Sequence, residues 1–257
     1  MKKAKDISPE HFIAEHFFVY TIKGTMNLFD GNEHRALQAG DSCIARKNRL
    51  GRIHNVREND ELEKVIIAFD EKFLQSFQEK HKLRAAKFKP VNTFIQLKQH
   101  PLLPYYIDSL QPYYKHGNLL APFGEVKREE LLLILLKSQP ELAGLFFDYG
   151  MPGKINIEAF MSRNYQFNIS IERFAFLTGR SLSAFKRDFK QAFNESPGRW
   201  LVLKRLQEAY FLIEKKHKKP SEIYLDLGFE TLSHFSYAFK AHFGLTPTAL
   251  LARRGGQ

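Results

Sequence analysis

The 257-residue sequence contains a single cysteine, Cys43, and no long apolar segment. One thiol excludes a disulfide scaffold and any site that needs several thiolate ligands. The longest purely aliphatic run, Leu131 to Leu136, is far shorter than the roughly 20 residues that cross a bilayer. The N-terminal residues also lack the apolar stretch of a secretory signal. We therefore expect a cytoplasmic protein that does not enter a membrane.

The motifs of common active sites are missing as well. The sequence has no Gly-x-Gly-x-x-Gly, Walker or Gly-x-Ser-x-Gly pattern. His16, His34 and His54 lie on separate segments without metal-ligand spacing. They could converge in space, but strand-edge or surface positions are the favoured interpretation. Cys43 is interpreted as a small buried side chain. We therefore expect no catalytic residue, no metal and no cofactor.

Basic residues are in excess and unevenly distributed. The chain has 39 Lys and Arg against 28 Asp and Glu, and the net charge of +11 fits nucleic acid, an anionic membrane surface or simple solubility. Residues 1–150 carry 22 basic and 19 acidic side chains, a net of +3, whereas residues 151–257 carry 17 and 9, a net of +8. This concentration predicts a site for an acidic partner in the C-terminal part.

A repeat lies within that basic part. Residues 181–197 align with residues 231–247 at an offset of 50 without a gap. Seven pairs are identical: Leu182/Leu232, Ser183/Ser233, Phe185/Phe235, Phe189/Phe239, Lys190/Lys240, Phe193/Phe243 and Pro197/Pro247. At 100° per residue, the phenylalanines of each copy share one face and the polar residues share the other. Each copy therefore predicts an amphipathic helix with a buried aromatic side.

Each of these helices follows a shorter apolar segment and a turn that contains glycine. Four hydroxyl residues are the predicted N-caps: Ser170, Ser181, Ser221 and Thr231. The pattern is typical of helix-turn-helix units, whose second helix enters the DNA major groove. We call residues 170–193 the first module and residues 221–243 the second module. Between them, Ser196 and Pro197 predict the start of a helix of about 17 residues, roughly 25 Å long.

Residues 155–252 resemble the AraC family of bacterial transcription regulators. The similar positions are Ala175, Gly179, Ser181, Arg187, Phe189 and Lys190 in the first half; Ser196, Pro197, Trp200, Leu201, Arg205, Ala209, Leu212 and Ile213 at the join; and Ile223, Gly228, Phe229, Ser233, Phe235, Phe239, Lys240, Phe243, Gly244, Thr246 and Pro247 in the second half. The resemblance implies a DNA-binding domain whose two recognition helices contact promoter DNA, with RNA polymerase as a further partner.

Side-chain chemistry then divides the recognition helices into base and phosphate contacts. Arg187 and Lys186, with Ser183 beside them, are expected at base edges, and Lys190 and Lys240 at phosphates. The other expected contacts are Ser181, Thr231, Leu232, Ser233, Ser236 and Tyr237. A solvated helix face is the alternative for every one of them.

Two positions depart from the family pattern. Tyr224 replaces an alanine in the first helix of the second module, which predicts altered packing. Tyr237 replaces an arginine, and a phenol cannot make the two-point contact with guanine that a guanidinium makes. We therefore expect the second module to contact mainly phosphate.

The N-terminal half has short strand-like segments separated by turn signals. Strands are expected at residues 17–22, 25–29, 42–46, 52–56 and 64–69, and Asp70 is the expected N-cap of a following helix. Regular short strands with glycine turns favour an antiparallel sandwich or a small barrel. The order resembles, loosely, the cupin-like sensing domain of AraC relatives. Further helices are expected within residues 101–110 and 125–136. They either pack on the sheet or, as their position in the family implies, form a homodimer.

The expected fold class is α+β in two domains, an antiparallel cupin-like barrel with accessory helices and an all-α domain with two helix-turn-helix units joined by a long helix. The expected boundaries are 1–150, with strands at about 16–69 and a helical dimerisation and linker segment at about 70–150, and 151–257. We predict a transcription activator controlled by a small-molecule effector or a protein partner at the N-terminal domain. A DNA-modifying or repair enzyme, or a regulator controlled only by a protein, are the alternatives.

Overall fold

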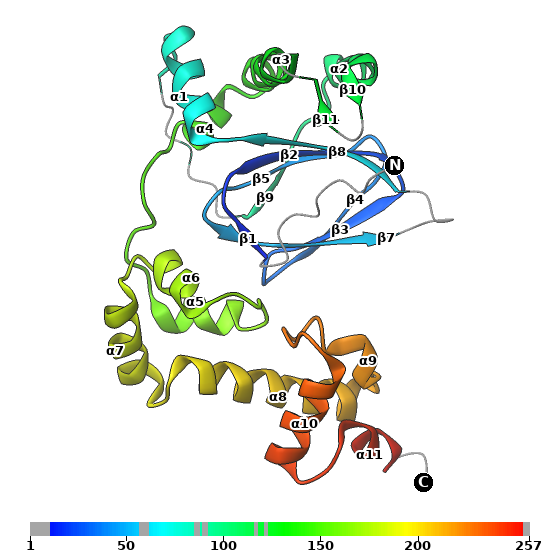
Figure 1. The fold of residues 1–257 in the computed structure, drawn as a ribbon, viewed down its shortest axis with the longest axis vertical. Helices are drawn as coiled ribbons and strands as arrows, with labels where there is room; N and C mark the ends of the chain where they lie inside the picture. Colours follow the sequence, from blue (N-terminus) through cyan, green and yellow to red (C-terminus); the bar gives the residue numbers. More distant parts are fainter. Residues whose placement is uncertain are drawn as a thin grey trace. The chain divides into compact units, whose positions relative to one another are not determined.

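The computed structural model describes residues 11–56, 62–84, 88, 92–115, 118–120 and 123–253. The chain divides into two compact units, residues 1–151 and residues 152–257. We call them the N-terminal unit and the C-terminal unit and describe each by itself. The N-terminal unit holds the strands with four α-helices, and the C-terminal unit consists of helices (Figure 1).

Two antiparallel sheets form the centre of the N-terminal unit. The larger has the order β8-β2-β5-β9, from strands Glu63–Phe69, His16–Lys23, Ser42–Ala45 and Phe94–Gln96. The smaller has the order β4-β3-β7, from strands His34–Leu37, Thr25–Phe29 and Arg52–Val56. The short strands β1 (Phe12–Ile13) and β6 (Arg49–Leu50) pair with each other, as do β10 (Tyr114–Lys115) and β11 (Asn118–Leu119). All five expected strands are confirmed.

The expected closed barrel is wrong for the part of the chain that the structure describes. Closure needs a continuous hydrogen-bonded ladder around the whole sheet, whereas here β8 and β9 are the edges of one sheet and β4 and β7 the edges of another. Strand β2 leads into β3 through Gly24, whose φ is +76°, and the two strands then join different sheets. The broader α+β class in two parts is confirmed.

Side chains alternate between the two faces of the larger sheet, and both faces are buried. In β2 and β5, Phe18, Tyr20 and Ile44 belong to the core shared with helices, whereas Val19 and Cys43 belong to a second core that also contains residues of β3 and β4. Figure 1 shows the helices over one face and the smaller sheet facing the other. This two-sided burial explains why these strands are almost continuously apolar.

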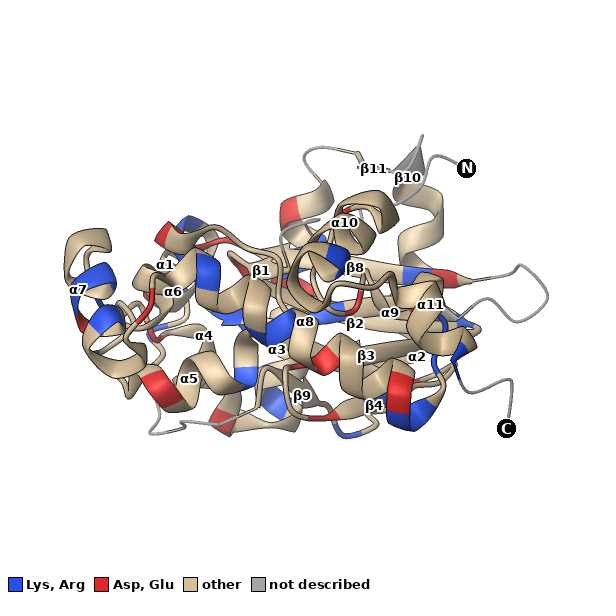
Figure 2. Cartoon of the chain, turned by 90° about the horizontal axis from the view of Figure 1, so that it is seen from below, with Lys and Arg blue, Asp and Glu red and all other residues tan. Residues whose placement is uncertain are grey.

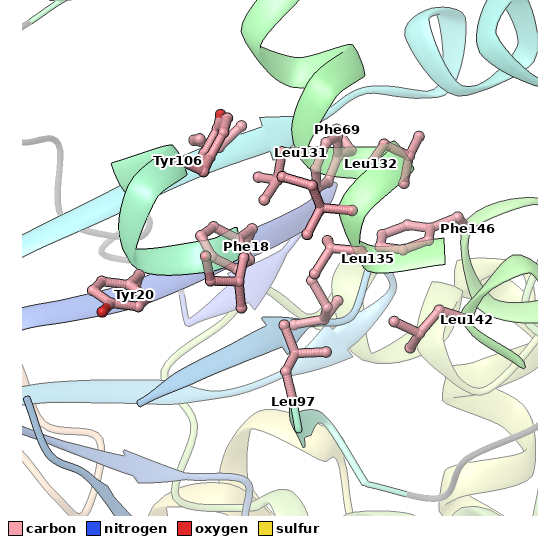
Figure 3. Packing of buried hydrophobic residues seen from close by; sticks show 14 of the residues in the cluster. Phe18, Tyr20, Phe69, Leu97, Tyr106, Leu131, Leu132, Leu135, Leu142 and Phe146 are labelled. Atoms are coloured by element: carbon pink, nitrogen blue, oxygen red, sulfur yellow. The ribbon is translucent and has the colours of Figure 1, made fainter. Parts of the chain in front are cut away.

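Helices α1 (Glu71–Lys80), α2 (Leu102–Leu110), α3 (Phe123–Ser138) and α4 (Ala143–Phe146) provide the helical side of that core. Asp70 caps α1 as expected, since its side chain accepts a hydrogen bond from the Phe73 N–H at 2.9 Å. Figure 3 shows Leu131, Leu132 and Leu135 packed against Phe18 and its neighbours. The buried face of α3 is therefore accounted for by packing on the sheet.

The C-terminal unit is a chain of seven helices among its described residues. They are α5 (Ile157–Asn164), α6 (Ile171–Leu177), α7 (Leu182–Phe193), α8 (Pro197–Lys216), α9 (Pro220–Ile223), α10 (Leu232–Phe243) and α11 (Pro247–Ala252). Helix α8 runs between α7 at one end and α10 and α11 at the other (Figure 1). Over its 20 residues an α-helix extends about 30 Å.

Candidate nucleic-acid interface

The first module consists of helix α6, a turn and helix α7. Ser170 caps α6 by accepting a hydrogen bond from the Arg173 N–H, and Ser181 caps α7 by accepting one from the Ala184 N–H, both at 3.3 Å. Gly179 has a φ of +67°, and a Cβ there would lie 2.4 Å from the carbonyl carbon of Gly153. The turn therefore requires glycine both for its backbone conformation and for the close approach of residue 153.

The second module repeats this arrangement with a shorter first helix. Helix α9 is only four residues long, and its N-cap is Lys219 rather than Ser221. The expectation for Ser221 is wrong because Pro220 occupies the first helical position, where its missing N–H costs no hydrogen bond. The helix ends before Tyr224, which lies half-buried against the apolar core of this module. Thr231 caps α10 as expected, through the His234 N–H at 3.1 Å.

Helix α8 provides one aromatic side chain to each module. Trp200 packs against Phe189 and Phe193 of α7, with ring centroids 5.6 and 4.6 Å apart. Tyr210 packs against Phe239 and Phe243 of α10, at 6.2 and 4.9 Å. The expected aromatic faces of both recognition helices are therefore confirmed as core, and each is held against the same central helix.

Arg205, at the middle of α8, joins the segment that precedes the first module to the turn of the second module. Its guanidinium is buried and donates hydrogen bonds to the backbone carbonyls of Tyr165, Phe167 and Gly228 at 2.7, 2.9 and 3.0 Å. The first two carbonyls precede α6 and the third lies in the turn of the second module. A Cβ on Gly228, whose φ is +82°, would lie 2.9 Å from the Arg205 Cζ. One side chain thus fixes the segment before α6 and the turn of the second module to the linking helix.

The opposite faces of α7 and α10 are exposed and differ in charge. All expected contact residues are exposed except Ser236, which is half-buried; they are Ser181, Ser183, Lys186, Arg187, Lys190, Thr231, Leu232, Ser233, Tyr237 and Lys240. Figure 2 shows Lys and Arg along α7 and α8, with fewer on α10. The most exposed large apolar side chain of α10 is Tyr237, at 77%.

A small ion cluster beside α7 was not expected from the sequence. Asp188 accepts hydrogen bonds from Arg180 Nε at 3.0 Å and from Arg187 Nη2 at 3.1 Å, and Lys154 Nζ lies 3.6 Å away. The hydrogen bond from Arg180 lowers the pKa of Asp188 below its usual value, and Arg187 and Lys154 lower it further. The adjacent opposite charges at positions 187 and 188 were the only signal for this contact in the sequence.

The N-terminal unit shows no comparable chemical site within the residues that the structure describes. No group of three His, Cys, Asp or Glu side chains there could hold a metal ion. His16 is buried on β2 with its ring against Phe146 at 5.6 Å, and burial lowers its pKa to about 3. His34 stacks on Phe29 at 4.5 Å. No described helix is both long and apolar enough to span a membrane.

Comparisons with known proteins agree with this division of the chain. The family model described as the ExsA N-terminal regulatory domain matches residues 16–145, which is half of the chain, and a helix-turn-helix domain model matches residues 174–253. The chain belongs to the AraC family of transcription regulators. It is therefore a member of a family of DNA-binding regulators and not of enzymes.

Several AraC-family proteins can be aligned with the chain. The virulence regulon transcriptional activator VirF of Yersinia enterocolitica is 26% identical over 58% of this chain and 55% of its own length. The regulator ExsA of Pseudomonas aeruginosa is 25% identical over 71% of this chain and 67% of its own. Among solved structures, a single-residue variant of ToxT from Vibrio cholerae is 14% identical, covers 95% of this chain and 90% of its own, and has a TM-score of 0.43. The chain spans about half the length of the first curated relatives that it matches.

Proposed function

We propose that this chain is a transcription activator that binds promoter DNA through the two recognition helices of the C-terminal unit. The observation that carries the proposal is the pair of exposed polar faces, on α7 and α10, that the 20-residue helix α8 holds apart. A helix of this length, together with the bodies of the modules, matches the roughly 34 Å between successive major grooves. A relative named as a transcriptional activator supports activation rather than repression.

Within this proposal the two modules contribute differently. Arg187 and Lys186 contact base edges in the first groove, with Ser183 and Ser181 beside them, and Lys190 contacts phosphate. In the second groove, Lys240 and the exposed residues around Tyr237 hold the backbone. That second set is Thr231, Leu232, Ser233, Ser236 and Tyr237. The first module therefore supplies most of the sequence preference.

The N-terminal unit, at about residues 1–150, acts as the regulatory domain, and 151–257 as the DNA-binding domain. Buried apolar side chains fill the space between its two sheets, among them Ile13, Val19, Met26 and Leu28. This filling supports control by a protein partner. An open cleft of about 490 Å³, which Tyr20, Asp41, Ser42, Leu97 and His100 help to line, is the candidate site for a small effector.

Apolar side chains exposed on α2 and α3 support a homodimer. Tyr105 is 72% exposed on α2 and Val126 is 61% exposed on α3, beside the buried face that packs on the sheet.

The protein acts in the bacterial cytoplasm, with RNA polymerase as the further partner of the promoter-bound protein.

Genome-wide footprinting of the full chain in its host tests this function. The expected result is a set of protected promoter sites with a common motif. In vitro binding to such a site should weaken steeply as salt rises, because phosphate contacts release counterions. The absence of any protected duplex, or a flat response to salt, would contradict the proposal.

A further inference from the structure

The contact between Arg187 and Asp188 leaves one defined edge of the arginine facing away. Both Nε and Nη2 of Arg187 donate to the same oxygen, Asp188 Oδ1, at 3.3 and 3.1 Å. A guanidinium carries five N–H donors in a rigid plane. Nη1 takes part in neither contact with Asp188, so the edge formed by Nη1 and the remaining hydrogen of Nη2 presents two parallel donors. That edge has the geometry needed for O6 and N7 of guanine.

Asp188 is itself held in place by a buried arginine. The Arg180 side chain is only 8% exposed and donates from Nε to Asp188 Oδ2 at 3.0 Å. The Arg180 Nη1 atom donates to the backbone carbonyls of Thr178 and Ile155 at 2.7 and 2.9 Å. Arg187, by contrast, is 68% exposed. A rigid series of contacts therefore runs from the backbone through Arg180 and Asp188 to an arginine that would otherwise sample many rotamers.

We propose that Asp188 is a specificity-determining residue that holds the Arg187 guanidinium with its outer edge directed at a guanine. The inference rests on the proposed function, because it assumes that α7 enters the major groove. The second module has no equivalent of this arginine–aspartate pair, since Tyr237 and Ala238 occupy the positions that correspond to Arg187 and Asp188. The arrangement therefore adds guanine preference to the first groove only.

The two effects of Asp188 on DNA binding have opposite signs, which makes the proposal testable. Its negative charge disfavours every phosphate nearby, whereas its hydrogen bonds fix the orientation of Arg187. Asp188→Ala should therefore leave binding to random duplex unchanged or tighter, while preference for guanine falls about 10-fold at one position. A residue with a purely structural role would weaken binding to all sequences together.

The experiment is an in vitro selection from a random duplex library with the full chain and its variants, followed by sequencing. Wild type should select a guanine at a fixed position, Arg187→Ala should lose it, and Asp188→Ala should reduce it. Asp188→Asn keeps an acceptor oxygen and should retain part of the preference. The double variant Arg187→Ala with Asp188→Ala should show no loss beyond that of Arg187→Ala alone.

Two further variants are matched controls for charge. Glu230→Gln removes a carboxylate next to the second recognition helix, where it accepts a hydrogen bond from Asn168 at 3.0 Å, and should tighten random binding without changing any base preference. Lys154→Ala removes the lysine from the ion cluster around Asp188 and leaves Arg187 in place. Thermal unfolding of each variant verifies that it is folded.

The outcomes separate this inference from the proposed function. If Arg187→Ala abolishes the guanine preference while Asp188→Ala leaves it intact, Asp188 has no positioning role. If Asp188→Ala sharpens the preference, the carboxylate competes with DNA and the inference is wrong. If Arg187→Ala leaves the selected motif unchanged, base contact by Arg187 fails together with the inference. Failure of wild type to select any motif contradicts the proposed function itself.

Discussion

The two helix-turn-helix modules keep the same scaffold and differ most in the charged residues on their outer faces. Both have a glycine with positive φ in the turn, a hydroxyl N-cap on the second helix and an aromatic side chain from α8 on their phenylalanines. Yet α6 has seven residues and α9 four. The outer face of α7 carries Lys186 and Arg187, whereas Ser236 and Tyr237 occupy the same positions on α10.

This difference shows which positions of a repeated module are constrained and which are not. Side chains of the core must fit each other closely, so a change of one methylene is felt, whereas solvent-facing positions tolerate most substitutions. The aromatic faces therefore stay alike and the polar faces diverge. This pattern is the basis for our proposal that the first module provides sequence preference and the second provides general affinity for the DNA backbone.

Removing Arg205, which joins the segment before the first module to the turn of the second, should have the largest effect. Arg205→Ala removes the guanidinium from three backbone carbonyls. The Phe167 carbonyl keeps a hydrogen bond from the Ile169 N–H at 3.2 Å, whereas those of Tyr165 and Gly228 lose this donor, and a buried unsatisfied group costs about 1–3 kcal/mol. We expect the free energy of unfolding of the C-terminal unit to fall by about 3 kcal/mol or more, measured by urea denaturation. Arg199→Ala is the control, because its exposed pair with Glu195 should contribute less than about 0.5 kcal/mol. Equal losses for both variants would contradict a special role for Arg205.

Substitutions at matched positions of the two recognition helices test the unequal contribution directly. Arg187→Ala should cost about 1–3 kcal/mol on a cognate site and much less on random duplex. Tyr237→Ala should weaken both duplexes by a similar, smaller factor, because a phenol offers no two-point contact with guanine. Titration of labelled cognate and random duplexes at fixed salt measures both ratios. A larger loss of discrimination for Tyr237→Ala would reverse the comparison.

The C-terminal ends of the recognition helices offer a smaller contrast in stability. Asn194 and Gly244 both have positive φ, +52° and +75°, and a Cβ on Gly244 would meet no atom within 4 Å. Gly244→Ala should therefore cost about 1 kcal/mol from backbone strain alone. Asn194→Gly should stabilise by at most about 0.5 kcal/mol. Thermal unfolding of both variants checks the signs, and a stabilised Gly244→Ala would refute the argument from backbone strain.

The two equivalent lysines should give the smallest and most similar effects. Lys190→Ala and Lys240→Ala each remove one proposed phosphate contact, so each should reduce the slope of log K against log salt by about 0.9. Neither should change the ratio of cognate to random binding. A change of that ratio for Lys190→Ala alone would place its ammonium group at a base edge.

The features that follow from local patterns were predictable from the sequence. The repeat at an offset of 50, the caps Ser170, Ser181 and Thr231, and the buried faces of α7 and α10 all depend on residues close together in the chain. The strands of the N-terminal unit were also found as short strand-like runs separated by turn residues. Each of these signals operates over a few residues.

The features that were missed depend on contacts between distant residues. Whether strand edges meet to close a barrel is decided by pairing across the sheet, and the edge strands β4 and β9 lie too far apart in sequence for any local pattern to show it. The helix at Pro220 begins two residues earlier than expected, because proline at the first helical position outweighs a hydroxyl cap. The hydrogen bond from Arg180 to Asp188 joins the turn of the first module to α7, and the periodicity of α7 does not mark it because Arg180 lies outside that helix.

The placement of Trp200 has a consequence for spectroscopy. It is the single tryptophan of the chain, and its indole lies against Phe189 and Phe193. Intrinsic fluorescence excited at the red edge of absorption therefore senses the contact between α7 and α8, while circular dichroism averages over every helix. If the two signals change at different denaturant concentrations, their separation measures how independently the first module opens. A natural, unlabelled chain is thus sufficient to follow one half of a duplicated domain.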